Sequence, residues 1–319
     1  MRLLAALVAF PLVTTFAPPA LFRDAPLPAL IAIGFDPVPL DTEHLARRRL
    51  GRLVYLGGWS IRSNDPRFGG ISAMHVEDGR VLALSDSGSL IEFGLPGRPG
   101  PVSIRPLPDG PRGDRGKLDR DAETLAVSGD KAWIAFEGRN AIWRYSRPSW
   151  RAESDAEPAP MRRWPGNTGS EALLRFPDGR FAVFAEHWLR PNGSSDVVAF
   201  AGDAAVPGTP TKTLGYRPPK NYRVTDAALL ADGRILFLNR RFSLLHGISA
   251  KLTVAAPRLA AGSVIEGEEI AHFDAPVTVD NMEALSVTRE AGRTIVWMAS
   301  DDNFNALQRT LLLKFELTE

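Results

Sequence analysis

One arrangement of apolar and polar positions returns five times along the chain from residue 69 onward. Each copy holds a short apolar run opened by a small or acidic residue, then a turn with Asp or Gly, then a second apolar run that ends in charge. The copies span Gly69–Gly88, Asp121–Gly138, Gly169–His187, Thr225–Arg241 and Asn281–Asn303. Their starts lie roughly 45 to 60 residues apart, a period typical of propeller blades.

Each copy is predicted to be a β-hairpin. Turn dipeptides separate the two apolar runs, at 78–79, 129–130, 178–179, 232–233 and 291–292. The flanking runs, such as Val81–Ser85 and Phe181–Ala185, are nearly continuous apolar stretches rather than strict alternations. Such strands are buried on both faces, which is typical of strands packed between neighbouring sheets.

Further strand-like segments follow the hairpins. Candidate third strands are Ser89–Leu95, Ala141–Ser146, Val197–Ala201 and Gly247–Ala255, and candidate fourth strands are Val102–Leu107, Thr211–Tyr216 and Val264–Phe273. Four antiparallel strands in a repeat make one propeller blade. The sequence therefore predicts an all-β protein, a β-propeller of five four-stranded blades, with six blades as the alternative.

The last repeat has only three strands of its own, its hairpin and Thr310–Leu317. The missing strand is supplied by Arg52–Ile61, which precedes the first repeat without belonging to it. Strands from both termini would then close the ring and remove an open sheet edge.

Two other architectures remain as alternatives, a β-sandwich and a pair of smaller β-domains. Sandwich strands would alternate more cleanly between apolar and polar residues. No change in composition marks a domain boundary, and the patch Arg151–Pro160 is interpreted as a surface loop. We therefore expect a single propeller domain over residues 47–319, preceded by an N-terminal extension over residues 21–46.

The first twenty residues are predicted to be a secretory signal peptide. Arg2 is followed by the apolar run Leu3–Ala17, and the next charge is Arg23. This run is short for a membrane span and is interrupted by Pro11. We expect a periplasmic or secreted protein with no transmembrane span after cleavage; an uncleaved anchor and a disordered tail are the alternatives.

The composition excludes some classes of partner and of reactive site. Lys and Arg number 38 against 37 Asp and Glu, so no basic surplus indicates nucleic acid as a partner. The chain has no cysteine, which excludes disulfides, thiolate nucleophiles and cysteine metal sites. We expect a monomer that acts on a small molecule.

The repeats also align their charges. Acids open the first strand at Glu123, Glu171, Asp226 and Glu283, and acids close the second strand at Asp86, Glu137, Glu186 and Asp301, with Arg240 in the fourth copy. In an antiparallel hairpin these two positions lie side by side. Both sets are therefore expected around one mouth of the central channel.

Eight carboxylates in one place repel one another unless a cation lies among them or some stay protonated. Calcium suits several carboxylate ligands with flexible geometry, so we predict a calcium site formed by Asp86, Glu123, Glu137, Glu171, Glu186, Asp226, Glu283 and Asp301. A salt-bridge network centred on Arg240 is one alternative, and acids that only hold neighbouring blades together are another.

Chemistry at this mouth is predicted from the same residues. Glu123, Glu171 and Glu283 are candidate general bases. His187 directly follows Glu186 at a strand end and is a candidate acid or base, with a turn-capping or exposed histidine as the favoured alternative. Arg240 and Asn303 are candidate substrate-binding residues. The sequence has no G-x-S-x-G motif, which favours water activated by a metal over a serine nucleophile.

The five motifs together resemble the esterase-like-activity-of-phytase family of exported bacterial proteins. The resemblance runs from about Gly69 to Leu317 and rests on segments such as DAETLAV from Asp121 and NMEALSV from Asn281. It implies a propeller related by name to calcium-dependent phytases, with esterase or phosphoesterase activity. The motif acids that it carries over are Asp86, Glu123, Glu137, Glu171, Glu186, Glu283 and Asp301.

Two functions are compatible with these features. The first is an exported hydrolase of a phosphate or carboxylic ester that uses calcium at the acidic mouth. The second is a propeller of the cell envelope that binds a ligand or partner without turnover, because propellers host many functions.

Overall fold

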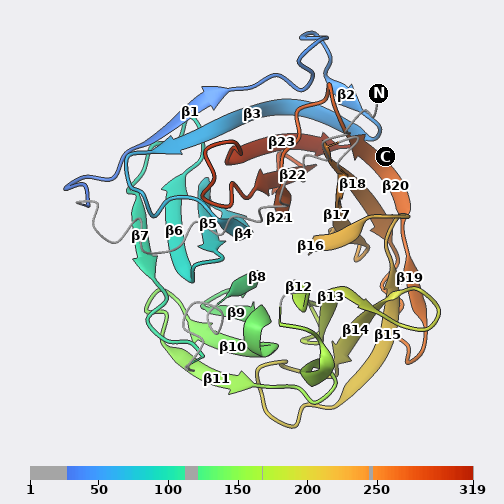
Figure 1. Cartoon of the computed structure of the whole chain (residues 1–319). Coiled ribbons are helices and arrows are strands. Elements are labelled where there is room, and N and C mark those ends of the chain that lie inside the picture. Colours follow the sequence, from blue (N-terminus) through green and yellow to red (C-terminus); the bar gives the residue numbers. More distant parts are fainter. Residues whose placement is uncertain (1–26, 112–120, 167, 244–246, 319) are drawn as a thin grey trace, which may run out of the picture.

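The computed structural model describes residues 27–111, 121–166, 168–243 and 247–318, and the predicted signal peptide lies outside this part of the chain. Five separate sheets surround a common axis (Figure 1). Their innermost strands are β4, β8, β12, β16 and β21, and each of these contacts the innermost strands of its two neighbours. The described residues thus form a five-bladed β-propeller, as predicted.

Blades one and two each consist of four consecutive antiparallel strands. Blade one contains β4 (Ile71–Glu77), β5 (Arg80–Ser85), β6 (Ser89–Gly94) and β7 (Ser103–Pro106). Blade two contains β8 (Ala122–Ser128), β9 (Lys131–Phe136), β10 (Ala141–Ser146) and β11 (Ala152–Ala156). A short 3₁₀ turn, η3 (Glu137–Arg139), follows β9, and η4 (Met161–Arg163) follows β11.

One short strand from the segment that forms blade four pairs with blade three instead. Blade three contains β12 (Ser170–Arg175), β13 (Phe181–Leu189), β14 (Ser195–Phe200), β15 (Thr211–Arg217) and β19 (Val264–Glu266). Blade four contains β16 (Arg223–Leu229), β17 (Ile235–Ser243), β18 (Gly247–Ala255) and β20 (Glu268–Phe273). The chain therefore crosses to blade three and returns before it completes blade four.

Blade five closes the ring with strands from both ends of the described chain. It contains β21 (Met282–Glu290), β22 (Arg293–Ser300), β23 (Leu311–Leu317), β3 (Leu53–Ser63) and β1 (Ile33–Pro37), and β2 (Arg49–Leu50) pairs with β3. Strands β3 and β23 are antiparallel, from the pair Leu53 and Leu317 to the pair Ser60 and Leu311. The predicted closure is confirmed, and β1 adds an outer strand from within the segment expected to be an extension.

Two expectations about individual segments are wrong. Residues 151–160, interpreted as a surface loop, contain the outer strand β11, whose alternating exposure explains its polar composition. Residues 264–273, expected as one strand, divide at Gly267 into β19 and β20. A Cβ at Gly267 would lie 2.8 Å from Thr253, so the close approach of β18 requires glycine at this break.

Apolar side chains fill the space between blades. Between blades three and four, for example, the rings of Phe184 and Phe237 lie 5.2 Å apart, and Tyr216 stacks on Phe237. Tyr216 is fully buried, and its hydroxyl donates to Asn239 Oδ1 at 2.7 Å. The nearly continuous apolar runs of the sequence are explained by this burial on both faces of each sheet.

Candidate functional site: the acidic mouth

A β-bulge interrupts the start of every innermost strand. Between Ala122 and Thr124, for example, two residues of β8 face one step of β9, and Glu123 is the extra residue. The extra residues of the five blades are Ser72, Glu123, Glu171, Thr225 and Glu283. A bulge re-aims the side chain that it carries, so this repeated irregularity sets the geometry at one end of the propeller axis.

Hydroxyl residues take the bulge position in blades one and four. Ser72 Oγ donates to the carbonyl oxygen of Ala122 at 2.5 Å, and Thr225 Oγ1 donates to that of Met282 at 3.0 Å. Each bond reaches the innermost strand of the next blade, so these two positions hold blades together. Glutamates occupy the same position in the other three blades.

The structure corrects the position expected of Asp226. This residue was aligned with the three glutamates, but Thr225 takes the bulge position and Asp226 follows it. Its two carboxylate oxygens accept hydrogen bonds from the backbone N–H groups of Ala227 and Leu285, both at 2.7 Å. Asp226 is therefore engaged in joining blade four to blade five, although burial raises its pKa well above the usual range.

The residues at the end of the second strand lie beside the bulges, as predicted. The backbone N–H groups of four acids donate to carbonyl oxygens two residues before the bulge, at 2.8 to 2.9 Å: Asp86 to Gly70, Glu137 to Asp121, Glu186 to Gly169 and Asp301 to Asn281. In blade four, Arg240 pairs in register with Arg223. We name this end of the axis, with Asp86, Asp121, Glu123, Glu137, Glu171, Glu186, Arg223, Arg240, Asn281, Glu283 and Asp301, the acidic mouth.

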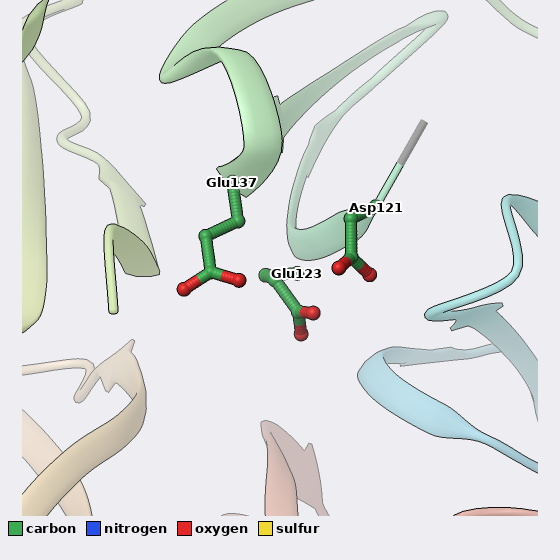
Figure 2. Close-up of side chains that lie close together, drawn as sticks. All are labelled: Asp121, Glu123 and Glu137. Carbon is green, nitrogen blue, oxygen red and sulfur yellow. The ribbon is translucent and has the colours of Figure 1, made fainter. Parts of the chain in front are cut away.

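Within the described part of the chain, blade two is the one blade that brings three carboxylates close enough to share a metal ion. One oxygen from each of Asp121, Glu123 and Glu137 lies within 4.8 Å of the others, and Figure 2 shows the three side chains converging. We call these residues the acidic trio. Glu137 is 6% exposed, and its Oε1 accepts a hydrogen bond from the N–H of Gly169 in blade three at 2.8 Å.

Burial opposes ionisation in the acidic trio. It raises the pKa of Glu137 to about 8; the Gly169 N–H lowers this pKa, and the charges of Asp121, Glu186 and Glu283 raise it. The pKa of Glu123 is raised well above its usual range, first by burial and then by neighbouring carboxylates that include Asp121 and Glu171. Without a cation, Glu137 is therefore mostly protonated at neutral pH, and Glu123 ionises less readily than an ordinary glutamate.

Arg240 supplies positive charge to another part of the mouth. Its Nη1 lies 3.0 Å from Glu283 Oε1 and also donates to Asn281 Oδ1, and its Nη2 lies 3.8 Å from Glu186 Oε1. Arg223 reaches the other oxygen of Glu186 at 3.2 Å. The predicted salt-bridge network is therefore present, and it engages the acids of blades three and five.

The charge of Glu171 interacts both with the acidic trio, through Glu137, and with Arg240. Burial raises its pKa well above the usual range, the charges of Glu186, Glu137 and Glu283 raise it further, and Arg240 opposes them. The pKa of Glu283 is raised by burial and by Glu186, while Arg240 and the Asn281 amide lower it. The predicted glutamates thus form one interacting set.

The remaining predicted residues differ in burial, since Asp301 is buried whereas Asn303 and His187 are exposed. Asp301 is 5% exposed, and its pKa is raised well above the usual range by burial, followed by the charges of Glu283 and Asp86. Asn303 is exposed, and its side-chain amide donates to Gln308 Oε1 at 3.1 Å. His187 is exposed as well and directly follows Glu186 in β13. Asn303 is thus engaged with Gln308, and both Asn303 and His187 are exposed, whereas the glutamates of the mouth are buried or half-buried.

Three mouth residues escaped the sequence prediction: Asp121, Arg223 and Asn281. Each stands two residues before a bulge position, where the other two copies carry Gly70 and Gly169. The sequence did contain a signal, because polar side chains occupy this repeat position in three of the five copies. It was missed because the sequence alone does not show the bulge that brings this position beside the glutamates.

The donors of the acidic trio fit a hard divalent cation. All three are carboxylates, which calcium accepts in irregular arrangements, whereas imidazole or thiolate donors would indicate zinc or copper. Positive charge at this place would also remove the repulsion that raises the pKa values of Glu123 and Glu137.

Two solved structures are similar to this chain. A glutaminyl cyclase from Myxococcus xanthus covers 85% of this chain and 100% of its own, at 13% identity and a TM-score of 0.50. An exo-1,5-alpha-L-arabinanase from a bovine ruminal metagenomic library covers 76% and 91%, at 14% identity and a TM-score of 0.47. At such identities the likeness to the cyclase shows the fold alone. No curated protein matches the chain.

The comparison with protein families is more specific. The family model described as phytase-like, esterase-like activity of phytase, matches residues 66–304, which include all five bulges and the whole acidic mouth. This match supports a hydrolase-like propeller and confirms the resemblance found in the sequence. The chain belongs to the phytase-like family described as esterase-like activity of phytase.

Proposed function

We propose that this protein is a metal-assisted hydrolase of a phosphate or carboxylic ester, and that its reaction takes place at the acidic mouth. The observation that carries the proposal is the acidic trio, in which three carboxylate oxygens from one blade lie within 4.8 Å of one another. Membership in a phytase-like family supports the reaction class.

Asp121, Glu123 and Glu137 would hold the cation, and calcium suits these ligands best. When bound, the cation would polarise the ester oxygen and lower the pKa of a water molecule. Glu137 is held in place for this role because its Oε1 also accepts the Gly169 N–H from the next blade. This hydrogen bond fixes Glu137 of blade two relative to blade three before a substrate arrives.

Glu171 is the best candidate for the general base among the three glutamates at bulges. Glu123 belongs to the trio, and Glu283 is paired with Arg240 at 3.0 Å. Glu171 interacts with both groups, and its raised pKa makes its carboxylate a stronger base than that of an ordinary glutamate. Arg240 and Arg223, across the axis in blade four, would attract the anionic part of a substrate.

A small substrate panel tests this proposal. Aryl phosphates and aryl acetates are incubated with the chain in calcium and in chelator, for the wild type, Glu123→Gln, Glu171→Gln and the control Glu157→Gln. Glu157 is exposed and directly follows β11, the outer strand of blade two, at the opposite edge of that sheet from β8. We expect calcium-dependent turnover that both mouth substitutions reduce by about a hundredfold or more, a typical size for the loss of acid–base catalysis.

Turnover that is unaffected by chelator, or reduced equally by Glu157→Gln, would contradict metal-assisted chemistry at this mouth. Saturable calcium or ligand binding without turnover of any substrate would instead favour the binding propeller. That result would leave the fold and the site in place but would remove the reaction.

Export is part of the same proposal. No helix among the described residues is long and apolar enough to cross a membrane. The charged start and the apolar run Leu3–Ala17 favour recognition by the export machinery. A reporter fused after residue 30 is expected to appear in the periplasm, and retention in the cytoplasm would overturn this part of the proposal.

A further inference from the structure

A cavity of 450 Å³ lies at the seam between blades four and five. It is lined by the turn Leu230–Arg234 between β16 and β17, whereas the mouth residues Arg223 and Arg240 lie at the other ends of these strands. The seven residues of β16 span roughly 20 Å. This seam cavity therefore opens on the face opposite the acidic mouth and is separate from the site described above.

The floor of the seam cavity is apolar. Leu230, Val254 and Ile270 line it and are only 6%, 7% and 3% exposed, and Leu317 of β23 completes this surface. The volume falls within the range of roughly 300–1,000 Å³ that is typical of small-molecule sites. A short hydrocarbon chain placed on this floor would be removed from water, which is favourable.

The rim of the seam cavity carries a surplus of positive charge. Arg52, Arg234 and Arg289 line it; Asp232 pairs with Arg234 and Glu268 pairs with Arg52, so Arg289 supplies the excess charge. Arg52 Nη2 donates to Glu268 Oε1 at 2.7 Å, and Arg289 Nη2 donates to the carbonyl oxygen of Gly292 at 2.7 Å. A guanidinium has several N–H donors, so these bonds leave both residues able to bind a further anion.

We propose that the seam cavity binds a small amphipathic anion, with a carboxylate or phosphate head and a short hydrocarbon part. The hydrocarbon part lies on the floor formed by Leu230, Val254 and Ile270. The head accepts hydrogen bonds from Arg52 and Arg289 at the rim. Charge-assisted bonds of this kind are strengthened beside an apolar surface, because the effective dielectric constant is lower there than in water.

Binding at this seam is coupled to the closure of the ring. Arg52 directly precedes β3, Leu317 ends β23, and Leu230 belongs to blade four. The bound anion contacts both closing strands and the neighbouring blade at once. It therefore stabilises the closed propeller by mass action, since the unfolded chain does not hold these groups together.

Calorimetry with octanoate as the probe tests this inference on the full chain at low ionic strength. We expect saturable binding that is at least about tenfold tighter than binding of 1-octanol, which lacks the charge, or of acetate, which lacks the chain. Octyl phosphate, measured in parallel, distinguishes a phosphate head from a carboxylate head. Octanoate is also expected to raise the melting temperature.

Variants separate the seam cavity from other arginines and from the mouth. Arg52→Gln and Arg289→Gln are each expected to weaken octanoate binding by about tenfold, the usual size for a charge-assisted hydrogen bond. The control Arg62→Gln removes an exposed arginine of β3 that pairs with Asp36, and it should leave binding unchanged. Glu123→Gln should also leave it unchanged, so the outcome does not depend on the proposed hydrolysis. Equal binding of octanoate and octanol, no saturation at millimolar concentration, or the same affinity in Arg52→Gln and Arg62→Gln would overturn the inference.

Discussion

Burial and neighbouring carboxylates make ionisation unfavourable for individual carboxyl groups at the acidic mouth. Glu123, Glu137 and Glu171 come from two neighbouring blades, and burial raises the pKa of each. Arg240 is engaged with Glu283 and Glu186 and acts mainly on their side of the mouth. The trio is thus the place where an added cation would change the energy most.

The pH dependence of stability follows from Glu137. Its pKa rises from 4.5 in the unfolded chain to about 8 in the folded protein, so the folded state binds more protons between these values. Stability without metal therefore falls as pH rises through this range. Glu137→Gln should flatten the fall, and Glu157→Gln should not. Urea unfolding in chelator at several pH values measures this, and an unchanged slope in Glu137→Gln would contradict the assignment.

At the scale of elements, the β-bulges turn ordinary hairpins into a site. The sequence predicted the hairpins, their blades and seven of the eight acids at equivalent positions, because turn dipeptides and apolar runs are local signals. It placed Asp226 one position away because TDAALL can be aligned on either Thr225 or Asp226. Only hydrogen-bond register distinguishes the two, and register depends on the partner strand.

The register of blade four has a measurable consequence. Asp226→Asn keeps the shape of the side chain but places an amide nitrogen against one of the two N–H donors, Ala227 or Leu285. We expect a loss of about 1–3 kcal/mol, the cost of one unsatisfied buried donor. Asp178→Asn in an exposed turn is the control and should change stability by less than about 0.5 kcal/mol. Equal effects in chemical denaturation would show that Asp226 does not join the blades.

At the scale of the whole molecule, the ring is closed by strands far apart in sequence. Pairing of β3 with β23 was predicted because the last repeat lacked one strand and a spare strand preceded the first. The crossing of β19 into blade three was not predicted, since a three-residue parallel pairing leaves no local signal. Closure leaves each blade packed between two others, which holds the mouth residues in fixed positions.

Truncation tests the closure directly. Deletion of residues 310–319 removes β23 and leaves β3 and β22 without their shared partner. We expect aggregation or loss of cooperative unfolding, because open sheet edges and apolar surface are exposed. Deletion through residue 37 removes β1, an outer strand, and should leave a cooperative fold of lower stability. Equal thermal unfolding of the parent chain and the C-terminal deletion would contradict closure by these strands.

The central claim is that the acidic trio binds a divalent cation, and calcium titration calorimetry tests it most directly. Chelator-treated wild type, Glu123→Gln and Glu157→Gln are compared near pH 7 in buffers of different ionisation enthalpy. The account predicts saturable binding with proton release, because Glu123 and Glu137 must ionise to become ligands. Binding should be lost in Glu123→Gln and retained in Glu157→Gln. No saturable heat in the wild type, or equal binding in both variants, would contradict the account.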